Sequence, residues 1–245
     1  MLLIYILTFT FIGSIASLVG SFFLLTRRRL TESFSGQIIN FAAGVLLATA
    51  FLDLLPEAAK EARGGNIFTP VLLGIVIFFF AERFIQWFHG HHQHGQMTNT
   101  WLILAGDGVH NFIDGVIITA SFLTSIPLGI VTSLAVGAHE IPQEIADMSV
   151  LLANGLSKKR ALLYNFLSAL TAFAGAILAF FFAATIRENL YIFLSLTAGF
   201  FIYISASDLI PSLHEKYLKN RRFSDSLIFI SGILAVFIFS RIFRG

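Results

Sequence analysis

The stretch that decides the fold is residues 101–152, where WLILAGDGVHNFIDGVIITASFL (101–123) is followed, three residues later, by PLGIVTSLAVGAHEIPQEIADMSVLL (127–152). Each run is mostly apolar and exceeds the roughly 20 residues that an α-helix needs to cross a bilayer. A charged side chain is costly at that depth, about 2.5–3.5 kcal/mol for Asp. The sequence therefore predicts two membrane helices whose polar residues face each other or a water-filled path rather than lipid.

The rest of the chain has the same apolar character. Of 245 residues, 56% are hydrophobic and 12% are charged, about half the charged fraction of a soluble domain, and the mean hydropathy is +0.82. The lack of Cys excludes a disulfide-stapled domain and thiolate metal ligands. A net charge of +2 offers no basic face for nucleic acid. These features predict an all-α polytopic membrane protein.

Eight stretches are long and apolar enough to span a membrane, and the connections between them are short. We therefore expect residues 1–245 to form a single transmembrane domain of eight helices. The first stretch lacks a basic segment before it and is expected to be a membrane helix, not a cleavable signal peptide. The predicted spans are Leu2–Thr26, Gly36–Pro56, Pro70–Phe88, Trp101–Leu123, Pro127–Leu152, Lys159–Ile186, Tyr191–His214 and Leu227–Phe243.

The Lys and Arg residues in the connections predict the orientation. One set of connections carries 11 of the 16 Lys and Arg residues, and the opposite set, with the C-terminus, carries five. Because cytoplasmic loops are enriched in Lys and Arg, the first set is expected to be cytoplasmic and both termini outside. The short extramembrane segments favour the plasma (inner) membrane of a prokaryote.

An internal repeat relates residues 43–56 to residues 198–211. Both begin with Ala-Gly, both place an Asp nine residues after the Gly (Asp53 and Asp208), and both end with a Pro three residues later. The two predicted helices run in opposite directions, which is typical of inverted-repeat transporters. We therefore predict a 3+2+3 arrangement, with helices 1–3 and 6–8 around helices 4 and 5. Asp53 is a candidate entrance ligand, and Asp208 with Ser207 a candidate exit ligand; polarity at helix ends is the alternative.

The polar residues of 101–152 fall on shared helix faces. His110 lies about ten residues into its helix and His139 about twelve, roughly 15–18 Å along the axis, so both lie near the midplane. Residues four apart share a face, so His110 pairs with Asp114 and His139 with Gln143. Pro142 is expected to kink its helix. The nine polar residues are Asp107, His110, Asn111, Asp114, His139, Glu140, Gln143, Glu144 and Asp147.

These nine side chains predict a metal path. Imidazole nitrogens with carboxylate and amide oxygens, and no sulfur, suit a borderline divalent ion such as zinc or ferrous iron. One His or Asn would fit a buried polar network between two helices, but nine polar groups, five of them acidic, favour a hydrated route. Asp107 and Asp147 extend that route toward the cytoplasm. A buried polar network and a metal-free proton relay remain alternatives.

A His-rich segment, residues 89–99, joins the third and fourth predicted helices on the cytoplasmic side. Closely spaced neutral imidazoles bind zinc or nickel weakly, so this segment is a candidate for transient metal capture. A polar linker is the alternative. Its histidines are His89, His91, His92 and His94.

The hexads HNFIDG (110–115) and HEIPQE (139–144) resemble the paired signatures of the ZIP (Zrt/Irt-like) metal transporters. The resemblance extends over the chain and implies uptake of zinc, with iron, manganese or cadmium, into the cytoplasm by an elevator-like, alternating-access motion of a homodimer. The metal is then a substrate, with no resident cofactor. The resemblance implies a primary metal site at His110, Asp114, His139 and Gln143. It also implies a second metal site at Asn111 and Glu140, with Glu144 as part of the same binuclear centre.

The chain departs from common family patterns at two places. Gln143 stands where many members have His, and no carboxylate occurs between Ser168 and Gly175, where some bacterial members supply one. Two rival functions remain. The His139-Glu140 pair opens a string like that of metalloproteases, but Gln143 stands where that motif needs a second His. A proton-driven carrier of another solute would need the acids but not two midplane histidines. We therefore predict a transporter and not an enzyme.

Overall fold

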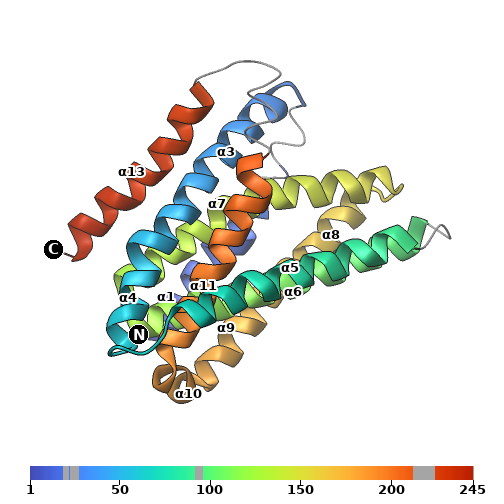
Figure 1. The fold of residues 1–245 in the computed structure, drawn as a ribbon. Helices are drawn as coiled ribbons and strands as arrows, with labels where there is room; N and C mark the ends of the chain where they lie inside the picture. Colours follow the sequence, from blue (N-terminus) through green and yellow to red (C-terminus); the bar gives the residue numbers. More distant parts are fainter. Residues whose placement is uncertain (19–21, 23–27, 92–95, 212–223, 245) are drawn as a thin grey trace.

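The computed structural model describes residues 1–18, 22, 28–91, 96–211 and 224–244, and over these residues it contains helices and no strand (Figure 1). The elements, with π-helical turns written η, are α1 (Leu2–Thr10), η1 (Phe11–Ile15), α3 (Arg28–Ala48), η2 (Thr49–Leu54), α4 (Leu55–Glu61), α5 (Phe68–His91), α6 (Gln96–Thr124), α7 (Ile126–Ala153), α8 (Lys158–Ala169), α9 (Thr171–Phe181), α10 (Ala183–Glu188), α11 (Leu190–Ile204), η3 (Ser205–Leu209) and α13 (Ser224–Arg244).

The eight predicted stretches are helical wherever the structure describes them, apart from turns at Leu170 and Phe182. Four described segments are long and apolar enough to cross a membrane by length and composition: Gln37–Glu61, Lys158–Phe181, Leu190–Ser207 and Ser224–Ile242. The all-helical, multi-pass character is therefore supported. The count of eight crossings and the 3+2+3 arrangement stay predictions.

The hairpin of α6 and α7 brings the two polar stretches together. Ser125 separates the helices, and its hydroxyl oxygen caps α7 by accepting from the backbone N–H of Leu128 at 3.3 Å. His110 lies 15 residues before Ser125 and His139 lies 14 after it. Because both helices rise about 1.5 Å per residue, the two histidines reach the same level. α7 continues through Pro142, so the expected kink does not end the helix.

Glycines let α3 and α13 pack backbone against backbone along their length (Figure 1). A Cβ atom added at Gly44 would lie 2.1 Å from the carbonyl oxygen of Phe229, and one at Gly232 would lie 2.3 Å from the carbonyl oxygen of Phe41. Both spacings are too short for any side chain. Small residues at such contacts are typical of helix packing in membranes.

The same close approach recurs at three other helix pairs. In each, an added Cβ atom would meet the partner helix's backbone within 3.3 Å. The contacts are made by Gly74 and Gly199 between α5 and α11, by Gly115 and Gly175 between α6 and α9, and by Gly13 and Gly137 between η1 and α7. Glycines therefore allow close backbone contact at these helix pairs.

Both arms of the repeat contain a π-helical turn. Asp53 lies in η2 and Asp208 in η3, each about ten residues after the Ala-Gly pair. A π-turn inserts one residue into an α-helix and is frequent at functional sites. The sequence repeat thus recurs as a repeat of local backbone geometry, which the apolar pattern did not predict.

Part of the His-rich segment is helical, so the connection between α5 and α6 is shorter than the predicted residues 89–99. α5 continues to His91 and α6 begins at Gln96, so residues 89–91 and 96–99 are helical. His89 and His91 therefore lie in the last turn of α5. His92 and His94 lie outside the described residues.

The packing of α13 on α3 yields a stability prediction. Gly232→Val should lower the free energy of unfolding by about 2 kcal/mol or more, because the new side chain must displace the backbone of α3. Ala235→Val is the matched control, since Ala235 lies one turn later on α13, is exposed, and borders a cavity of about 270 Å³. The measurement is thermal unfolding in detergent. Equal unfolding midpoints for the two variants would contradict this packing.

Candidate metal centre

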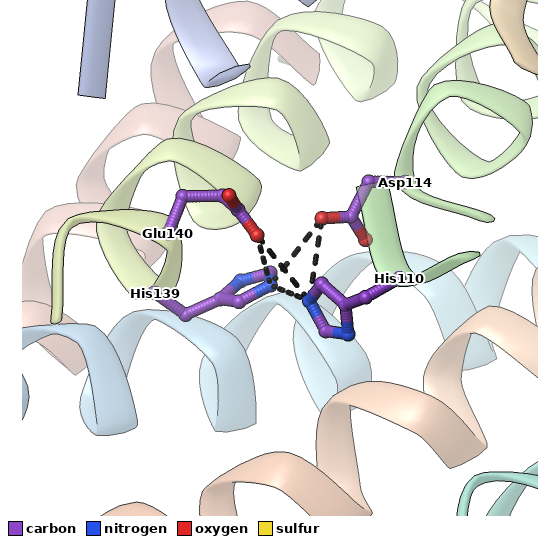
Figure 2. Close-up of side chains that lie close together, drawn as sticks. All are labelled: His110, Asp114, His139 and Glu140. Carbon is purple, nitrogen blue, oxygen red and sulfur yellow. Dashed lines mark hydrogen bonds and ion pairs between the residues drawn. The ribbon is translucent and has the colours of Figure 1, made fainter. Parts of the chain in front are cut away.

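Four side chains from α6 and α7 point toward one another (Figure 2). The Nε2 atom of His110 lies 3.2 Å from Nε2 of His139 and 3.3 Å from Oε1 of Glu140. Oδ2 of Asp114 lies 3.6 Å from Nε2 of His110 and 3.5 Å from Nε2 of His139. The four donor atoms all lie within 4.8 Å of one another. Among the described residues, this is the one group of three or more potential metal-ligating side chains that converges in this way.

The spacing of the donor atoms fits a tetrahedral ion. Bonds of about 2.0–2.1 Å place the ligands of tetrahedral zinc about 3.3 Å apart. The five separations that involve a histidine nitrogen run from 3.2 to 3.8 Å, and all six lie within 4.8 Å. Two nitrogens and two oxygens form a donor set that zinc accepts. The centre can therefore hold one divalent ion with little movement of its side chains.

The centre lacks internal compensation for its negative charge. Asp114 and His139 are 3% exposed and Glu140 is fully buried, with neither oxygen of Glu140 hydrogen-bonded to a described residue. Nδ1 of His139 lies 3.1 Å from the carbonyl oxygen of Ala135, which holds the ring with Nε2 toward the centre. Two carboxyl groups and two imidazole nitrogens thus converge where a divalent cation would be strongly stabilised.

Aromatic rings from α5 and α11 border the two histidines. The ring of Phe78 on α5 meets the His110 ring edge-on, with 5.5 Å between the ring centroids. The centroid of the Phe201 ring, on α11, lies 6.2 Å from that of the His139 ring. The two imidazole planes are inclined by 84° to each other. Both helices therefore contribute apolar surface that limits how the imidazoles can tilt.

Asn111 and Gln143, two of the predicted ligands, lie beside the centre and bind Asp107. Nδ2 of Asn111 donates to Oδ1 of Asp107 at 2.9 Å, and Nε2 of Gln143 donates to the same atom at 3.2 Å. The hydroxyl of Ser14 lies 2.9 Å from Oδ1 of Asn111. The structure thus brings His110, Asp114, His139 and Glu140 together and leaves both amides in an adjacent network.

Glu144, the remaining predicted ligand, faces α8 instead of the four-residue centre. It is buried and accepts a hydrogen bond from Nδ2 of Asn165. Asn165 was not predicted as a residue of the site, although an Asn within an apolar run was a visible signal. Ser14 was not predicted either, because sequence alone does not distinguish it from a small packing residue.

Among the described residues, the four-residue centre includes none of the predicted pathway residues, and Asp107 lies beside it. Asp53 is fully buried in η2 and accepts a hydrogen bond from Ser240 of α13. Ser207 is exposed, and its hydroxyl donates to the carbonyl oxygen of Tyr203 at 2.8 Å. Asp147 is partly buried on α7. For Asp208 only the backbone position, within η3, is described.

Comparison with known proteins identifies the family of this chain. A model of the ZIP zinc transporter family matches residues 1–100 and 89–240. The zinc transporter ZIP10 of Danio rerio is 40% identical over 129 residues, 52% of this chain and 15% of the relative. The zinc transporter ZIP6 of Homo sapiens is 41% identical over 120 residues, 49% of this chain and 16% of the relative. The metal cation symporter ZIP14 of Bos taurus is 40% identical over 131 residues, 54% of this chain and 26% of the relative.

The match thus spans about a sixth to a quarter of the length of these curated relatives. The family model, in contrast, covers nearly all of this chain, and the resemblance read from the two hexads is confirmed. The chain belongs to the ZIP zinc transporter family.

Proposed function

We propose that this chain transports divalent transition-metal ions across a membrane, with zinc as its principal substrate and iron, manganese and cadmium as further candidates. The observation that carries the proposal is the convergence of His110, Asp114, His139 and Glu140 within an apolar helical chain. The relatives reported above are named zinc transporters and a metal cation symporter. The ion is cargo and not a resident cofactor, and the chain is a transporter and not an enzyme.

The charge of the centre matches a dehydrated divalent ion. Two ionised carboxylates and two neutral imidazoles carry a charge of −2, which one divalent cation neutralises. The mixture of nitrogen and oxygen donors without sulfur suits zinc and ferrous iron. Asn111, Gln143 and Glu144, beside the centre, are candidate ligands for a second ion or for an ion in transit.

Hydrogen bonds between helices support an elevator-like motion with two bodies. One group joins η1, α6, α7, α8 and α9, as between Ser14 and Asn111 or between Asn165 and Glu144. A second group joins α3, η2, α5, α11, η3 and α13, as between Tyr203 and Glu82 at 2.6 Å. The glycine contacts divide in the same way. We infer that the first group carries the ion past the second.

The space between the two groups is suited to sliding. A groove of about 540 Å³ is lined by η1, α3, α7 and α13, and its lining is mostly apolar, including Ile12, Phe41 and Leu134. Apolar contacts can shift without breaking directional hydrogen bonds. The groove therefore supports relative motion of the two groups, within a 3+2+3 arrangement of eight helices.

The remaining assignments complete the transport route. Asp53 serves near the entrance, and Asp107, Asp147, Ser207 and Asp208 follow toward the cytoplasm. The histidines of the His-rich segment collect ions transiently. We further propose a homodimer in the plasma membrane with both termini outside. The curated relatives reported above are from animals and give no support for a prokaryotic source in particular.

The first functional test concerns the two histidines. His139→Ala and His110→Ala should each reduce saturable zinc uptake into proteoliposomes to background, because each removes one of four ion ligands. The matched control is Ser149→Ala, ten residues beyond His139 on α7, where the hydroxyl bonds the carbonyl of Ile145 in its own helix. Near-normal uptake by both histidine variants, with normal protein in the membrane, would show that the centre does not bind the transported ion.

Gln143→His should shift metal preference and add pH dependence. One ring nitrogen could donate to Asp107, as the amide does at 3.2 Å, while the other binds the ion. Zinc should then bind more tightly, because imidazole is a softer ligand than an amide oxygen. Tighter binding lowers the apparent KM for zinc and can slow release. At acidic pH protons compete for the new imidazole, so the gain should shrink.

The measurement for Gln143→His is the zinc-to-iron uptake ratio at about pH 7.5 and about pH 5.5, on either side of the ordinary histidine pKa of about 6.5. The ratio should rise at the higher pH and approach that of the parent protein at the lower pH. Ratios equal to those of the parent at both values would mean that Gln143 does not contact the ion.

Orientation can be tested directly because the chain has no Cys. Glu188→Cys, at the end of α10, should react with a membrane-impermeant maleimide added outside, and Lys159→Cys, at the start of α8, should react only after permeabilisation. Both positions are exposed in the structure. Labelling in the opposite pattern would reverse the proposed topology and the inferred direction of uptake.

A further inference from the structure

Asp107 holds two side-chain amides of the site at one oxygen atom. It lies on α6 one turn before His110, is 5% exposed, and its Oδ1 accepts from Nδ2 of Asn111 at 2.9 Å and from Nε2 of Gln143 at 3.2 Å. The α6–α7 hairpin accounts for the second contact, since Asp107 and Gln143 both lie 18 residues from Ser125. An ionised carboxylate accepts hydrogen bonds and does not donate, so both amides must turn their N–H groups toward Asp107.

The other end of each amide is held differently. Oδ1 of Asn111 lies 2.9 Å from the hydroxyl of Ser14, so Asn111 is fixed at both ends. Oε1 of Gln143 makes no hydrogen bond to a described residue, so Asp107 supplies the one hydrogen bond that orients this side chain within the described part of the chain. A Gln143 side chain rotated by half a turn would present its NH2 group where it now presents oxygen.

We propose that Asp107 is a positioning residue that fixes the Gln143 amide with its oxygen, and not its N–H groups, available to the metal ion. The inference rests on the proposed function, because it assumes that the centre takes a divalent cation. For Asp107 it replaces the role of an ion ligand on the pathway. An amide oxygen attracts a cation, whereas an NH2 group repels it, so the orientation of this amide decides whether Gln143 helps or opposes binding.

A positioning role and an ion-ligand role for Asp107 predict different effects of the same substitutions. A positioning residue needs a hydrogen-bond acceptor, which Asp107→Asn keeps in its amide oxygen and Asp107→Leu removes. An ion ligand needs the negative charge, which both substitutions remove. Loss of a residue that orients a metal ligand typically weakens binding about 10- to 100-fold.

The test is zinc uptake by the full chain in proteoliposomes, with zinc binding in detergent measured in parallel. Asp107→Asn should stay within about threefold of the parent in apparent KM, and Asp107→Leu should raise it about tenfold or more. Thr119→Val is the matched control on α6, because Thr119 bonds the carbonyl of Ala176 across to α9 away from the site. That control should leave the apparent KM unchanged.

A double-mutant cycle shows whether Asp107 acts through Gln143. In a Gln143→Ala background, Asp107→Leu should raise the apparent KM for zinc by less than about threefold, because the amide that Asp107 orients is gone. If Asp107→Leu does not fold, Asp107→Ser replaces it in the cycle. The isosteric Asp107→Asn still tests whether the negative charge is needed.

The outcomes distinguish this inference from the proposed function. A parent protein that binds and moves no divalent metal would overturn the proposed function. A parent that transports zinc while Asp107→Asn is as impaired as Asp107→Leu, or an additive double-mutant cycle, would overturn the positioning role and leave the function intact.

Discussion

The structure depends on one electrostatic constraint: two carboxylates and two imidazoles share a space less than 5 Å across inside an apolar helical chain. Two ionised carboxylates this close together and away from water would repel each other, and a bound cation offsets that repulsion. The cluster persists only if the surrounding helices hold it rigidly. The chain does so by carrying all four side chains on one hairpin, α6 and α7, whose turn at Ser125 sets both histidines at the same level.

The hairpin is in turn held by residues and backbone groups outside the four-residue centre. Gly115 and Gly137 let α9 and η1 approach the hairpin backbone closely. The carbonyl oxygen of Ala135 determines which nitrogen of His139 faces the centre. Asp107 orients the neighbouring amides. The geometry of the four ligand atoms thus results from an outer layer of contacts, which is how metal sites are commonly tuned.

Sequence patterns predicted much of this arrangement because they concern distances along the chain. The nearly equal spacing of His110 and His139 from a turn, and the i, i+4 spacing of Asp114 from His110, bring residues together in any hairpin of regular helices. Contacts that depend on the rotation of one helix against another were not predictable. The bond from Gln143 to Asp107, the contact of Asn165 with Glu144 and the π-turn around Asp53 are of this kind. The pattern therefore identified which residues converge better than it identified their hydrogen-bond partners.

The contacts around the centre differ in kind from one side to the other, and this asymmetry bears on mechanism. Directional hydrogen bonds to the residues of the site come from η1 and α8, through Ser14 and Asn165. From α5 and α11 the site histidines receive the rings of Phe78 and Phe201. A hydrogen bond in an apolar interior is lost when its partners separate by an ångström or two, leaving polar groups unpaired, whereas moving a phenyl ring away from an imidazole breaks no hydrogen bond. The site is hydrogen-bonded to η1 and α8 and makes apolar contacts with α5 and α11. It is therefore suited to move together with η1 and α8 past α5 and α11.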